Sequence, residues 1–135
     1  MEHNGIVLEE ALVAALEAVE GLKGRVCPVV DIQKSTGPLV VYDQREENGQ
    51  QTLAGRTELM AAGFQIHVLH GTYFKMRQLA EQVKEAIYSL CGYNTAPLLI
   101  ETVTVELASP DIMETKVSLF RRTYNINFQY QIREE

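Results

Sequence analysis

The sequence predicts an α+β domain: a mostly antiparallel β-sheet with two main helices packed on one face and a projecting β-hairpin. Two segments, 4–22 and 72–90, repeat apolar residues at three- and four-residue steps, which is typical of amphipathic helices. Other segments alternate apolar and polar residues, the period of a half-buried strand. The order is one helix, three strands, a second helix and two strands. The 135 residues fit a single domain, 1–135.

The first expected element is an amphipathic helix of about four turns. Its apolar stripe is formed by Leu8, Leu12, Ala15, Leu16, Val19 and Leu22. Asn4 is the expected N-cap, and the region from Gly21 to Gly24 is expected to end the helix. Residues 1–23 contain five acidic residues and one basic residue, a net charge of −4, so the outer face is acidic.

A β region follows this helix. Residues 26–32 alternate in character, and Ser35-Thr36-Gly37-Pro38 then forms a turn. Pro28 has no amide hydrogen to donate, which favours an edge position or the start of a strand. Residues 39–42 begin a second strand that continues through Glu47.

A hairpin turn is expected at Asn48-Gly49, because both residues tolerate positive φ. The returning arm, residues 50–53, is polar. An arm with so little apolar content has no core to pack on, so we expect the hairpin, residues 43–57, to project from the domain.

The second half of the chain is also expected to form strands and a helix. Residues 64–68 alternate as a half-buried strand, and Thr72 is the expected cap of the second helix. The buried stripe of that helix comprises Met76, Leu79, Ala80, Val83, Ile87 and Leu90, and the helix is expected to end near Cys91-Gly92. Two closing strands are expected, over residues 102–107 and 124–133, and the second alternates with unusual regularity.

Composition and charge exclude several classes of protein. The net charge of −6 argues against a nucleic-acid wrapping protein, which needs a basic face to displace counterions. No apolar run approaches the roughly 18 to 20 residues of a membrane span, and the N-terminus lacks the pattern of a signal peptide. Cys27 and Cys91 lie far apart and are interpreted as small core residues of a protein in a reducing cytoplasm.

Little in the sequence indicates catalysis. His67 and His70 are the only close histidines, and a separation of three places them on opposite faces of a strand, so no metal site is expected. No nucleophile elbow, phosphate loop or dinucleotide motif is present. We therefore expect no enzyme, no catalytic residues and no cofactor. Arg56 and the pair Arg121-Arg122 are interpreted as ion-pairing residues, for which an oligomer interface is a natural place.

The order of these pieces resembles the tail-terminator, or tail-completion, proteins of long-tailed bacteriophages, including the tail-to-head joining family. The resemblance covers nearly the whole chain and depends on element order and short apolar cues. These cues are Arg25-Val26-Cys27-Pro28, Pro38-Leu39-Val40-Val41-Tyr42, Leu53-Ala54-Gly55-Arg56, Phe64-Gln65-Ile66-His67-Val68 and Met76-Arg77-Gln78-Leu79-Ala80-Glu81-Gln82-Val83.

The resemblance implies a structural virion protein that forms a ring, expected to be a hexamer, on the completed tail tube. Such a ring stops tube polymerisation and presents the surface that joins the tail to the head connector. The implied partners are further copies of the chain, the tail tube protein and the head completion or connector protein. DNA passes through the channel without sequence-specific binding. The implied location is the head-proximal end of the tail, and the host cytoplasm during assembly.

The polar hairpin is the best candidate for contacting a neighbour or the tube, and we expect it to order on assembly. The candidate interface residues are Arg45, Glu46, Glu47, Asn48, Gln50, Gln51, Arg56, Arg121 and Arg122. The acidic first helix has two interpretations: it faces the DNA channel, where it repels phosphates, or it only keeps the helix soluble. Two other functions stay open: a head-side connector or adaptor of the same particle, and a dimeric small-ligand-binding α+β domain.

Overall fold

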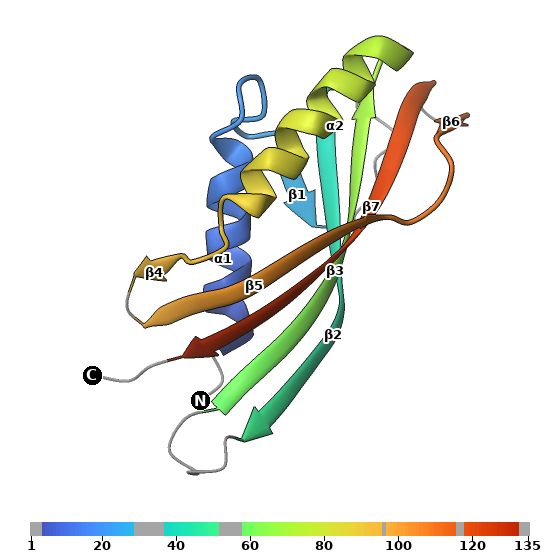
Figure 1. Ribbon diagram of the computed structural model, residues 1–135. Coiled ribbons are helices and arrows are strands. Elements are labelled where there is room, and N and C mark those ends of the chain that lie inside the picture. Colours follow the sequence, from blue (N-terminus) through green and yellow to red (C-terminus); the bar gives the residue numbers. More distant parts are fainter. Residues whose placement is uncertain (1–3, 29–36, 52–57, 96, 116–117, 133–135) are drawn as a thin grey trace.

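The computed structural model describes residues 4–28, 37–51, 58–95, 97–115 and 118–132. Within this part of the chain, a seven-stranded sheet carries two helices on one face (Figure 1). The elements are α1 (Asn4–Glu17), β1 (Val26–Pro28), β2 (Leu39–Gln51), β3 (Glu58–His70), α2 (Tyr73–Tyr88), β4 (Asn94–Thr95), β5 (Leu98–Leu107), β6 (Ile112–Glu114) and β7 (Leu119–Ile132). The predicted α+β class is confirmed.

The sheet has the strand order β1-β2-β3-β7-β5-β4, and β6 pairs with the first residues of β7. Only β1 and β2 are parallel; the other pairs are antiparallel. The long β7 therefore lies in the middle, between β3 on one side and β5 with β6 on the other. Pro28 belongs to the edge strand β1, as its missing amide hydrogen predicts.

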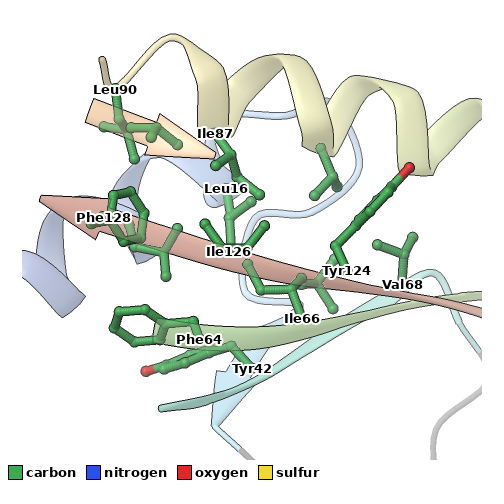
Figure 2. Close-up of a cluster of buried hydrophobic side chains, with 14 of the residues drawn as sticks. Leu16, Tyr42, Phe64, Ile66, Val68, Ile87, Leu90, Tyr124, Ile126 and Phe128 are labelled. Atoms are coloured by element: carbon green, nitrogen blue, oxygen red, sulfur yellow. The ribbon is translucent and has the colours of Figure 1, made fainter. Parts of the chain in front are cut away.

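The main core lies between the sheet and the helices. Alternate residues of β7 point into it, as the sequence pattern predicts: Tyr124, Ile126 and Phe128 are buried (Figure 2), and so is Tyr130. Phe128 meets Phe64 of β3 edge to face, with ring centroids 5.8 Å apart. The intervening Asn127 and Gln129 are exposed on the other face of the sheet. Among the described residues, that face has apolar packing only at one end of the sheet, where Leu39, Val41, Leu69 and Leu119 form a small cluster with Cys27.

Helix α2 begins where the sequence predicts. The Thr72 hydroxyl accepts a hydrogen bond from the Lys75 amide at 3.3 Å, which satisfies one of the free donors of the first turn. The predicted stripe, Met76, Leu79, Ala80, Val83, Ile87 and Leu90, is buried. No described helix combines the length and apolar character that a membrane crossing requires.

Helix α1 ends earlier than the apolar pattern indicates. The helix stops at Glu17, and tighter turns continue the chain, since the Leu22 amide donates to the Val19 carbonyl at 3.0 Å. These turns still bring Leu22 into the core beside Leu8, Leu12 and Leu16. The apolar spacing therefore reflects burial over the whole segment, although only part of it is α-helical.

The predicted turn at Asn48-Gly49 is wrong. Both residues lie inside β2, whose pairing with β3 continues without a break from Glu46 opposite Gly63 to Gln51 opposite Glu58. β3 is itself held by β7 on its other side, so continuing the ladder outweighs the local turn preference of two residues. Any turn between β2 and β3 falls within residues 52–57, outside the described residues. The expected hairpin is thus a continuation of the sheet.

Candidate functional site

Two long strand edges have no neighbouring strand in the described part of the chain. β1 pairs with β2 only at Val40, Val41 and Tyr42, which leaves the outer side of residues 43–51 without a partner strand. β4 pairs only with the first two residues of β5, Leu98 and Leu99. The outer side of β5 residues 102–107 is therefore open. The strand order places these edges on opposite flanks of the sheet. Such an edge presents backbone donors and acceptors that pair readily with another strand.

Most of the predicted interface residues lie on the β2 edge. Arg45 occupies a bulge, and its exposed guanidinium contacts Asp43 at 3.0 Å and donates to the side chain of Gln65 at 2.6 Å. Five further candidates lie in the C-terminal half of β2, where the structure describes only the backbone: Glu46, Glu47, Asn48, Gln50 and Gln51. Arg56 lies outside the described residues.

Arg121 and Arg122 point to opposite faces of β7, as adjacent strand residues must. Arg121 lies on the helix-free face and pairs with Glu114 at 2.9 Å. Arg122 lies on the helix side and donates two hydrogen bonds to Asp111, at 2.8 and 2.9 Å. These bonds lower the pKa of Asp111 and raise that of Arg122. The expected ion pairing of both arginines is confirmed, and it occurs within the chain.

The two histidines are also on opposite faces. His67 lies on the helix-free face, where its Nδ1 is 2.9 Å from the Thr123 hydroxyl. Burial, reinforced by the charges of Arg121 and Arg45, lowers the pKa of His67. The predicted interface residues Arg45 and Arg121 therefore share the helix-free face. No group of three or more metal-ligating side chains occurs among the described residues.

The uncovered part of the helix-free face is polar, with amide and hydroxyl groups along its centre and charged residues, among them Asp43 and Glu106, toward its flanks. The Gln65 amide donates to Asn125 at 3.2 Å, and the Thr102 hydroxyl lies 3.2 Å from the Gln129 side-chain oxygen. Thr104 and Asn127 are paired across β5 and β7 and are exposed. Amide and hydroxyl groups therefore dominate the centre of this face.

A groove beside α1, which we call the acidic groove, was not predicted. Its volume is about 490 Å³, and it is lined by Glu9, Glu10, Val13, Ala14, Glu17 and Tyr42. The Tyr42 hydroxyl donates to the Glu9 carboxylate at 2.6 Å, which ties α1 to β2. Burial and this bond raise the pKa of Tyr42. Glu9 and Tyr42 are 33 residues apart, so no local sequence pattern could predict that they meet in this groove.

A second surface, the apolar corner, gathers exposed apolar side chains where α2 begins. It comprises the exposed side chains of Tyr73, Phe74 and Met113, which lie around the partly buried Phe120: the Tyr73 ring contacts Phe120, and Met113 is its cross-strand partner. The Tyr73 ring lies 5.9 Å from the rings of both Phe74 and Phe120, and the Phe74 side chain is 79% exposed. The sequence pattern does not reveal this corner, because the three-residue strand β6 is too short to show a periodicity.

Comparisons with known proteins identify a fold but no family. No protein-family profile matches the sequence, and no curated protein matches it. Among solved structures, the fold is similar to that of a chain in a structure described as the virion of a native gene transfer agent (GTA) particle. The similarity covers 92% of this chain and 94% of that chain, with a TM-score of 0.52 and 15% sequence identity.

Proposed function

We propose that this protein is a structural subunit of a phage-like virion, which caps the tail tube as a ring, expected to be a hexamer. The observation that carries the proposal is the fold shared with a GTA virion chain over nearly the full length of both chains. A head-proximal position, where the ring stops tube growth and meets the head connector, agrees with the element order on which the tail-terminator resemblance depends. This role requires neither a cofactor nor a catalytic group.

The open edges supply a mechanism for ring formation. β2 and β5 run in opposite directions, because each step from β2 through β3 and β7 to β5 is antiparallel. The β5 edge of one copy therefore meets the β2 edge of the next as an antiparallel pair. Because the edges lie on opposite flanks, the contact is head-to-tail, the type that closes into rings.

In such a ring, the helices belong on the outside, where the circumference is larger. The helix-free face then lines the channel, and its central amide and hydroxyl groups neither bind nor strongly repel the phosphates of passing DNA. The acidic outer face of α1 would then lie away from the channel. This arrangement favours the solubility interpretation of those glutamates.

Deleting the gene from the genome that encodes it tests the proposal. Without a cap, tubes should grow beyond their normal length and fail to join heads, as seen by electron microscopy, and a plasmid copy of the wild-type gene should restore normal particles. Tails of normal length beside unjoined heads would instead indicate the head-side adaptor. Unaffected particles would contradict both virion roles.

A further inference from the structure

We infer that the apolar corner of one copy inserts Phe74 into the acidic groove of the next copy. The inference rests on the proposed ring and names a second contact between its subunits. Its residues differ from those of the strand-edge pairing, because neither surface contains the edge residues of β2 or β5.

The apolar corner has the features of an inserting surface. Phe74 stands in the first turn of α2 with 79% of its surface exposed, although its ring neighbour Tyr73 is held in place. The Tyr73 hydroxyl accepts from Arg77 at 3.1 Å and donates to Asp111 at 3.3 Å. An exposed aromatic side chain on such a fixed base loses little conformational freedom on binding.

The acidic groove has the features of a matching receptor. Its lining includes the apolar side chains of Val13 and Ala14, and its volume of about 490 Å³ has room for one aromatic ring. The lining also includes three glutamates, Glu9, Glu10 and Glu17. A partner for this groove must therefore present an apolar group together with positive charge.

The charges around Phe74 meet this requirement. Lys75 is exposed next to Phe74, and Arg77 lies one turn further along the helix. Asp111, which accepts a hydrogen bond from Tyr73 of this corner, is occupied by its two bonds to Arg122. The corner is thus locally positive in a chain whose net charge is −6, whereas the groove is negative. This complementarity identifies a second copy of the chain as the occupant.

The two surfaces also lie on the correct flanks. The groove includes Tyr42 of β2, on one flank of the sheet. The corner includes β6, which pairs with β7 on the side opposite β3, the flank to which β5 belongs. A head-to-tail contact that joins β5 to β2 therefore brings corner and groove toward the same interface.

Two single variants and their mixture test the contact. Lys75→Glu and Glu17→Lys each place like charges across the interface, so each protein alone should assemble at least about 10-fold more weakly than wild type. Mixed in equal amounts, the two proteins should assemble again, because every contact in an alternating ring pairs opposite charges. Phe74→Ala should weaken assembly at least about 10-fold, whereas Tyr88→Ala, which truncates an exposed aromatic at the other end of α2, should not.

Assembly is measured by light scattering and native mass spectrometry over a concentration series, with circular dichroism to verify that each variant is folded. The inference is overturned if Phe74→Ala assembles like wild type, or if the mixture assembles no better than its components. It is also overturned if wild type and the mixture both stay monomeric at every concentration. Overlong tails in the gene deletion would then still support the proposed cap, so the two failures are distinguishable.

Discussion

The ion pair between Arg122 and Asp111 gives a prediction whose size follows from burial. Their side chains are only 12% and 13% exposed, and two hydrogen bonds join them. Asp111→Asn keeps the shape of the side chain but leaves the guanidinium of Arg122 without a countercharge. We expect the free energy of unfolding to fall by about 3 kcal/mol, the cost of stranding a buried charge.

The neighbouring pair provides a matched control. Arg121 and Glu114 are joined through a single guanidinium nitrogen at 2.9 Å, and their side chains are 27% and 24% exposed. Greater exposure screens this pair, so Glu114→Gln should cost at most about 1 kcal/mol. Urea unfolding followed by circular dichroism measures both variants under identical conditions.

A double variant shows whether the stranded charge is the cause. Arg122→Met combined with Asp111→Leu removes both charges and should recover most of the stability lost in Asp111→Asn. The reasoning is refuted if the double variant is as unstable as Asp111→Asn, or if Asp111→Asn costs no more than Glu114→Gln. Either result would show that burial does not determine how much the Arg122–Asp111 pair contributes to the free energy of unfolding.

Three further predictions concern the core, the second helix and pH. Phe64→Ala should lower the free energy of unfolding by about 3 to 5 kcal/mol in urea titrations, because it empties a fully packed position against Phe128. Thr72→Ala should cost about 1 kcal/mol through the lost cap, and Thr72→Ser should retain most of it. The folded-state pKa of His67 lies below 6.5, so the unfolded chain binds the extra proton first and stability should decrease as pH falls below 6.5. His67→Gln should weaken that decrease between pH 7 and 5; an identical profile would contradict the assignment.

The parts of the fold that the sequence predicts well are those in which local pattern and packing agree. The α2 stripe and the alternation of β7 each follow one period over many residues, so burial of one face determines the structure. The turn at Asn48-Gly49 was predicted wrongly because its signal covers two residues, whereas the pairing that overrides it involves β3, which is itself held by β7 far along the chain. Short strands such as β6 show no period at all.

The candidate surfaces divide in the same way. The exposure of Arg45 follows from its polar strand segment, and the opposite orientations of Arg121 and Arg122 follow from strand geometry. The acidic groove and the apolar corner each join segments that are distant in sequence, Glu9 with Tyr42 in the first case and Tyr73 with Phe120 in the second. Only tertiary structure brings those residues together, so no local pattern predicts these surfaces.

The central position of β7 has a consequence for biosynthesis. This strand is made after every other described strand, yet it joins the pair β2–β3 to β5. During synthesis, the edges of β3 and β5 that face β7 therefore stay unpaired until β7 is made. The β3–β7 ladder can form only when two segments that are far apart in the sequence come together. A nascent chain that stops before β7 has no continuous sheet, so an unfinished copy presents no pair of opposite flanks to its neighbours.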